Sequence, residues 1–343
     1  MAAVEPEAPP NQLEHIEAEE GSDADSALGS EAATSTTSLA SSVLDYVYEN
    51  GRRYQRSRRG EDSMFPNDEQ EQDRLDLVHH VYLLTQKGAL FAAPIKNPKR
   101  ALDIGTGTGL WALDFADQFP DCQVIGVDIS PIQPNWVAPN CQFIVDDLEA
   151  DWVYPEDKHF DYIHQRSMAG SIGDWPRLFR QVYDNLNPGG WFEIQEFMAW
   201  FYAQNTDGSG NDDLSEDTPL VKWQKLCDEA SIKIGRRLNC AGDLPEPFKA
   251  TGFTDVKHQV VKVPVGTWPK DKRLREMGQF LHVQMSQALD AVTLAYLTRV
   301  LKWSEQETQV FMAQVRNDFN ARSKSMHLYT FMHYMYGKKP ESA

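Results

Sequence analysis

The stretch RALDIGTGTGLWALDFA, residues 100–116, decides the fold. An apolar run typical of a buried strand leads into glycines at three alternate positions, Gly105, Gly107 and Gly109, and then into the apolar spacing of a helix. Glycine adopts positive φ and has no Cβ, so a ligand can approach its backbone closely. A helix that begins directly after such a loop presents free N–H groups to the ligand. The stretch therefore predicts a strand–loop–helix unit that binds a cofactor.

The spacing of the glycines separates two classes of cofactor. Dinucleotide-binding loops read G-x-G-x-x-G, where the third glycine lets the helix pack closely under a pyrophosphate. Here the pattern is G-x-G-x-G, and position 110 is leucine. The spacing therefore disfavours an NAD-dependent dehydrogenase, a hypothesis that measurable NAD binding would revive.

Strands and helices alternate on both sides of this loop. After the strand at 100–105, strands are predicted at 123–130, 141–149, 159–165, 191–197, 252–266 and 326–337, and helices at 68–84, 109–119, 175–186, 220–237 and over much of 267–325. The last of these helices is predicted to begin with a capping box, Ser304 and Glu307. Alternation at this spacing indicates an α/β fold with a parallel sheet covered on both faces.

Composition divides the chain into four parts. Residues 1–43 form an acidic, Ser/Thr-rich tail that we expect to be disordered, because it has scarcely any large apolar side chain to bury. Residues 44–99 precede the cofactor loop, 100–200 hold the cofactor-binding core, and 201–343 complete the domain. The net charge of −18 disfavours direct binding to nucleic acid.

The motif D-x-G-T-G-T-G resembles motif I of class I S-adenosylmethionine-dependent methyltransferases. In that family a carboxylate at the position of Asp128 binds both ribose hydroxyls, a task that suits a group accepting two hydrogen bonds. The resemblance further implies that Asp147, or alternatively Asp146, binds the adenine amino group, and that the backbone N–H of Leu148 binds the ring. Asp103 is implied to lie beneath the loop and to orient the methionine amine indirectly. The alternatives are a helix N-cap at Asp128 and a purely structural role for Asp103.

Further stretches narrow the resemblance. YENGRRY, PNDEQEQDRLDLVHH and LFAAPI look like successive signatures of the LaeA-like fungal methyltransferases, whose best-known member works with velvet proteins on secondary metabolism and development. The family implies a class I methyltransferase Rossmann-like sheet, mostly parallel with the last strand antiparallel. It also implies a helical N-terminal lid over the cofactor and a helical insertion between strands six and seven. Velvet-type or other regulatory proteins are the implied partners.

The sequence does not identify a catalytic residue. His164 and Glu196 stand at the ends of two predicted strands, and Tyr54 belongs to the implied lid, so each is a weak candidate for orienting a nucleophile or accepting its proton. The adjacent His79 and His80 point to different faces of a helix, so no metal site is predicted.

The resulting hypothesis is an S-adenosylmethionine-dependent methyltransferase whose acceptor is a protein side chain, a secondary metabolite or the enzyme itself. The alternative is a partner-binding regulator that uses the cofactor fold as a scaffold. The chain shows no membrane segment, no secretory signal and no C-x-x-C pair among its four cysteines, and it carries an arginine-rich run at 51–60. We therefore expect a cytoplasmic protein, a nuclear protein, or one present in both compartments.

Overall fold

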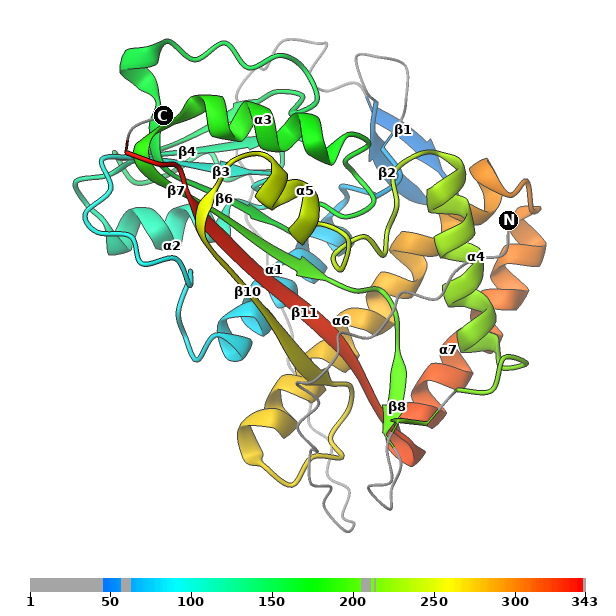
Figure 1. Ribbon diagram of the computed structural model, residues 1–343. Helices are drawn as coiled ribbons and strands as arrows, with labels where there is room; N and C mark the ends of the chain where they lie inside the picture. Colours follow the sequence, from blue (N-terminus) through cyan, green and yellow to red (C-terminus); the bar gives the residue numbers. More distant parts are fainter. Residues whose placement is uncertain (1–45, 57–62, 205–210, 213, 342–343) are drawn as a thin grey trace.

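The structure, a computed structural model, describes residues 46–56, 63–204, 211–212 and 214–341 (Figure 1). The predicted acidic tail and the arginines at 58 and 59 lie outside these residues. No helix within the described ranges is long and apolar enough to cross a membrane.

A nine-stranded sheet runs through the molecule (Figure 1). Five parallel strands stand in the order β5-β4-β3-β6-β7: β3 is Arg100–Ile104, β4 Gln123–Asp128, β5 Cys141–Val145, β6 Phe160–Arg166 and β7 Leu186–Phe197. Four further strands complete it, namely β8 (Tyr202–Gln204), β9 (Asn211–Asp212), β10 (Thr254–Pro264) and β11 (His327–Lys338). Strand β11 lies antiparallel between β7 and β10. The expectation of a mostly parallel sheet with an antiparallel last strand is confirmed.

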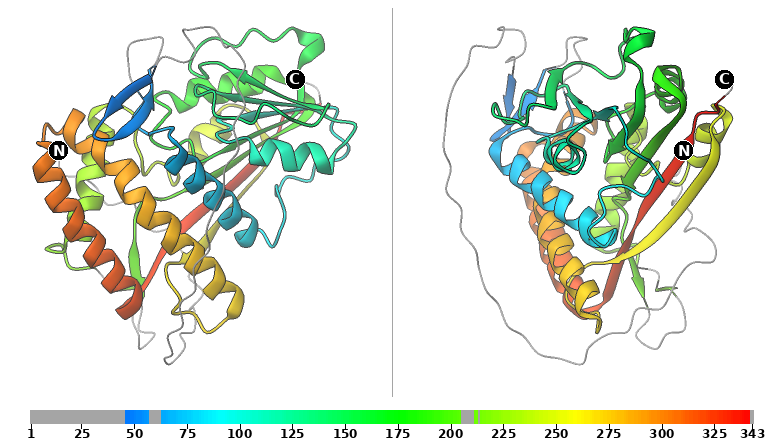
Figure 2. Two further views of the ribbon diagram at one scale, coloured as in Figure 1. Left: turned by 180° about the vertical axis from the view of Figure 1, so that it is seen from behind. Right: turned by 90° about the vertical axis from the view of Figure 1, so that its left-hand side faces the viewer.

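Helices cover both faces of the sheet (Figure 2). Their bounds are α1 Glu69–Thr85, α2 Leu110–Gln118, α3 Trp175–Asn185, α4 Pro219–Lys233, α5 Pro245–Ala250, α6 Lys272–Ala295 and α7 Glu305–Ser325, with a 3-10 turn at Glu156–Lys158 and a π-helical turn at Tyr296–Val300. Helices α3 and α5 lie on one face, and α1, α2 and α6 lie on the other. The insertion between β10 and β11 is helical as expected, and α7 begins with the Ser304–Glu307 capping box.

Three of the four apolar clusters among the described residues fix helices to the sheet. Phe179 and Phe248 pack in one beneath α3 and α5, and Trp111 and Phe115 pack in another beneath α2. The third lies between α1, α4, α6 and α7 and contains the fully buried Trp223. Burying one large apolar side chain contributes roughly 1.5–3 kcal/mol, so the helices on both faces are fixed to the sheet.

The N-terminal segment is only partly helical, which corrects the expectation of a helical lid. Strands β1 (Tyr46–Glu49) and β2 (Arg52–Gln55) form an antiparallel hairpin before α1. Its two turn residues, Asn50 and Gly51, have φ of 51° and 75°, as a type I′ turn requires, and Asn-Gly is the strongest short hairpin signal. Arg52 then forms a two-pronged ion pair with Asp68, the N-cap of α1.

Candidate functional site

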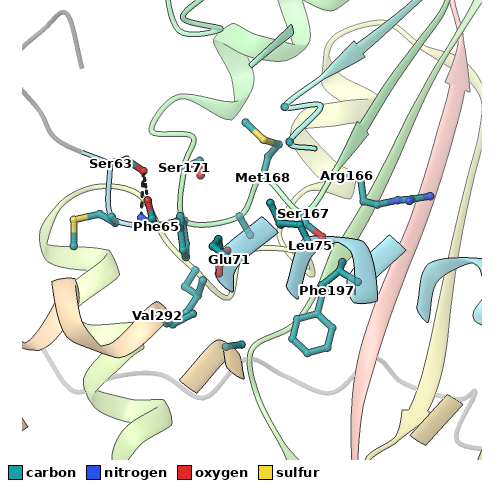
Figure 3. Close-up of a pocket in the computed structure, with 18 of the residues that line it drawn as sticks. Ser63, Phe65, Glu71, Leu75, Arg166, Ser167, Met168, Ser171, Phe197 and Val292 are labelled. Atoms are coloured by element: carbon teal, nitrogen blue, oxygen red, sulfur yellow. Dashed lines mark hydrogen bonds between the residues drawn. The ribbon is translucent and has the colours of Figure 1, made fainter. Parts of the chain in front are cut away.

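A cavity of about 600 Å³ opens where the parallel strands end (Figure 3). Its walls are the glycine loop after β3, the carboxyl ends of β4 to β7, and helices α1, α4 and α6. In open α/β sheets ligands bind at this edge. Figure 3 shows side chains of the N-terminal segment, Phe65, Glu71 and Leu75, around the same cavity as Ser167 and Met168 from the loop after β6. The chain before the glycine loop thus covers the cavity with residues 63–67 and helix α1.

The glycine loop is a bare backbone surface at the base of the cavity. Gly105, Gly107 and Gly109 have φ of +71°, +56° and +85°, values that favour glycine. A Cβ on Gly105 would lie 2.0 Å from the Sδ of Met168, and one on Gly109 would lie 2.4 Å from the Phe143 ring. Gly105 and Gly107 line the cavity, whereas Gly109 is the N-cap of α2 and lies outside the lining.

Asp128 lies at the end of β4 and lines the cavity. Its Oδ2 accepts the N–H of Gly107 at 2.8 Å and its Oδ1 accepts that of Ser130 at 2.9 Å. Burial raises the pKa of this carboxyl. Each carboxylate oxygen has a second lone pair, so the same group that fixes the glycine loop can accept hydrogen bonds from two further hydroxyls.

The end of β5 supplies the next polar groups. Asp146, Asp147 and Leu148 all line the cavity. The Oδ1 of Asp147 accepts the N–H of Glu149 at 2.9 Å, and the Oδ1 of Asp146 accepts the N–H of Asp147 at 2.8 Å. The cavity thus combines three features: the glycine loop without side chains, carboxylates at the ends of two neighbouring strands, and an apolar wall. Together they fit the adenosyl and methionine parts of S-adenosylmethionine.

Asp103 and His164 form a buried pair beneath the loop and do not belong to the cavity lining. The Nδ1 of His164 lies 2.7 Å from the Oδ1 of Asp103, and the Thr106 hydroxyl donates to Oδ2 at 2.6 Å. The imidazole stacks on Trp111 with ring centroids 3.7 Å apart. Burial lowers the pKa of His164 to about 4. The pair thus supports the loop from below, and His164 does not line the cavity.

Replacing His164 with leucine is expected to lower the free energy of unfolding by about 2–3 kcal/mol, because a buried carboxylate loses a hydrogen-bond partner. Binding of S-adenosylhomocysteine by the folded protein should remain within about threefold, as expected for a group outside the cavity. Chemical denaturation and calorimetry measure the two effects. A variant of unchanged stability that has lost methyl transfer would instead assign His164 a catalytic role.

Tyr54 also lies away from the cavity lining. Its side chain is buried on β2, the Arg299 guanidinium lies 4.3 Å from its ring centroid, and burial raises its pKa to about 12. A phenol with so high a pKa stays protonated and is a poor proton acceptor. The position of Tyr54 therefore favours a packing role between the hairpin and the turn after α6.

Glu196, near the end of β7, does line the cavity and is buried. Its Oε1 accepts the N–H of Met168 at 2.7 Å and contacts the Gln165 amide, and its Oε2 accepts the N–H of Ala169 at 3.3 Å. Burial raises its pKa to about 7. Because both oxygens are engaged by the chain after β6, the side chain is arranged to position that loop against Gly105.

Glu196 makes a pH-dependent contribution to stability. Its pKa in the folded chain lies above the ordinary value of 4.5, so the folded state keeps a proton that the unfolded chain has already released. The stabilisation from this retained proton is complete below pH 4.5 and is lost as the pH rises through 7. The pKa shift corresponds to about 3 kcal/mol in the free energy of unfolding. The difference in free energy of unfolding between the unchanged chain and Glu196→Gln should therefore shift by that amount between pH 4 and pH 8. A difference that is constant with pH would contradict the shifted pKa.

Comparison with known proteins identifies the family. Residues 54–258 match the model of a methyltransferase domain. The chain belongs to the LaeA-like class I S-adenosylmethionine-dependent methyltransferases. It is 42% identical to methyltransferase pytC of Aspergillus terreus over 90% of this chain and 91% of that protein. It is 35% identical to the protein-methionine methyltransferase laeA of Emericella nidulans (85% and 76% covered) and 32% identical to the secondary metabolism regulator laeA of Aspergillus flavus (91% and 82%).

In this methyltransferase a charged pair in the cavity wall escaped prediction. Glu71 and Arg74 on α1 line the cavity and form a two-pronged ion pair, with nitrogen–oxygen distances of 2.8 and 2.6 Å. They continue toward the N-terminus the same helix face as Leu75, Val78 and Val81, which also line the cavity. The sequence did contain a signal for this pair, because Glu71 and Arg74 stand at helical spacing from the apolar residues of the same face.

Proposed function

We propose that this chain transfers the methyl group of S-adenosylmethionine to an acceptor bound in the same cavity, and that the reaction serves fungal secondary metabolism. One observation carries the proposal: the cavity joins Gly105, Gly107 and Asp128 at one end to an apolar wall of α4 and α6 at the other. Relatives named as a secondary metabolism regulator and as methyltransferases support the biological role.

Bound S-adenosylmethionine supplies a methyl group on a sulfonium, which is already activated because the leaving group is a neutral thioether. The chain therefore has to hold and orient both partners and exclude water, and such positioning contributes roughly 7–11 kcal/mol in favourable cases. Asp128 and the glycine loop hold one end, and Glu196 fixes the loop that closes over Gly105. A general base is needed only for an acceptor that is protonated.

Partners and location are proposed on the resemblance to the LaeA-like family: a velvet-type or other regulatory protein, and the cytoplasm, the nucleus or both. Within the arginine-rich run, Arg52 and Arg53 of the hairpin form ion pairs with Asp68 and Glu69 at the start of α1. Co-purification with a velvet protein tests the partner, and a fluorescent fusion tests the location.

Methyl transfer tests the proposed function directly. The full chain is incubated with methyl-labelled S-adenosylmethionine and fungal extract, and the products are separated into protein and small-molecule fractions. Label is expected in an acceptor with the unchanged chain and not with Gly105→Val, which is designed to lose the cofactor. Absence of label from every fraction, although the cofactor binds, would favour the non-catalytic regulator instead.

A further inference from the structure

The side of the cavity toward β7 and β11 has a wall of its own. The sheet order places the ends of β4 and β5 on one side and β7 with β11 on the other. On the latter side the cavity is lined by one face of α6 together with a residue each from α4, β7 and β11: Leu281, Gln284, Met285, Ala288, Val292, Trp223, Phe197 and Met332. None of these side chains is charged. These side chains themselves offer no counter-ion to a lysine or arginine side chain, whereas the carboxylates of Glu71 and Glu196 line other parts of the same cavity.

Gln284 is the one polar side chain in this wall. It is 5% exposed, and its neighbours on the same helix face are Leu281, Met285 and Ala288. Within the described part of the chain, no hydrogen bond is found for its amide, although buried polar groups are normally hydrogen-bonded. An amide that lies on a cavity wall and has no hydrogen-bond partner among the described residues is suited to a ligand's polar group.

Resting on the proposed function, we propose that the α4–α6 end of the cavity is an acceptor chamber for a small, mainly apolar molecule, and that the Gln284 amide hydrogen-bonds the carbonyl or hydroxyl of that molecule. The apolar wall supplies affinity by excluding water, and the single amide supplies orientation, as in other small-molecule sites. Gln284 thereby sets which acceptors are aligned with the cofactor end.

The helix offers a matched control. Gln279 lies one and a half turns before Gln284 on α6, is exposed and is not part of the cavity lining. Gln284→Leu removes the amide at nearly constant volume, and Gln279→Leu makes the same change outside the chamber. Ala288→Phe fills the chamber, and S-adenosylhomocysteine binding reports whether each variant is folded.

The experiment measures fragment binding to the full chain saturated with S-adenosylhomocysteine, by ligand-observed NMR. Benzamide, a ring with one amide, and ethylbenzene, a ring without one, are the probes. Gln284→Leu is expected to lower the affinity for benzamide about tenfold, which corresponds to one neutral hydrogen bond. The affinity for ethylbenzene should stay the same or increase. Ala288→Phe should weaken both probes, and Gln279→Leu neither.

The outcomes separate this proposal from the proposed function. If S-adenosylhomocysteine binds but neither fragment does, or if Gln284→Leu and Gln279→Leu affect benzamide equally, the chamber is overturned while the proposed function stands. Methyl label recovered only in protein would likewise overturn it. Failure of S-adenosylhomocysteine to bind the unchanged chain would overturn the proposed function itself.

Discussion

Replacing Gly105 with valine is expected to lower the affinity for S-adenosylhomocysteine at least 100-fold, the largest effect of any single change. The backbone φ of +71° is a strained conformation for a β-branched residue. The new Cβ would also lie 2.0 Å from the Sδ of Met168 and 3.0 Å from two further atoms of that side chain. Because Met168 itself lines the cavity, moving its side chain would change the shape of the cavity next to the glycine loop.

Gly88 provides the control for this substitution. It has a φ of +87°, a Cβ placed on it would meet no atom within 4 Å, and it lies outside the cavity lining. Gly88→Val therefore introduces comparable backbone strain without touching the site. Calorimetry should show unchanged S-adenosylhomocysteine affinity for Gly88→Val and none measurable for Gly105→Val. A folded Gly105→Val chain that binds as tightly as the unchanged chain would refute the assignment of the loop.

Replacing Asp128 with alanine is expected to lower the affinity for S-adenosylhomocysteine about 100-fold. A hydrogen bond to a charged group contributes about 1.5–3 kcal/mol, and two ribose hydroxyls would lose their acceptor. The change also leaves the N–H groups of Gly107 and Ser130 without their partner, so the loop itself loosens. Asp128→Asn, which keeps one side-chain oxygen, should show a smaller loss.

Asp161 is the matched control for Asp128. Its Oδ2 accepts the N–H groups of Lys99 and Arg100 at 2.6 and 3.2 Å, so it too binds backbone beside a strand, but it is not part of the cavity lining. Asp161→Ala should reduce thermal stability and leave the affinity unchanged. Equal losses of affinity in the two variants would show that Asp128 acts only through general stability.

Much of the fold was predictable because its signals are local. The glycine pattern, the alternation of apolar runs and the capping box at Ser304 are each read within a few residues, and each corresponds to an element of the structure. The hairpin at 46–55 was missed although its Asn50–Gly51 turn is also a local signal, because the expectation of a helical lid came from the family resemblance.

The candidate site was predictable where it consists of strand ends. Parallel strands bring their carboxyl ends to one edge, so Gly105, Asp128 and Asp147 come together without further information. The packing of His164 against Asp103 depends on strand register, since the two are direct partners on β6 and β3. Gln284 reaches the cavity only through the packing of α6, which no nearby sequence pattern specifies.

Titration of the full chain with S-adenosylhomocysteine by calorimetry tests the central claim most directly. We expect one site per chain with a dissociation constant in the micromolar range, lost in Gly105→Val, and no heat from NAD. No binding at millimolar S-adenosylhomocysteine, or saturable binding of NAD in its place, would contradict the account.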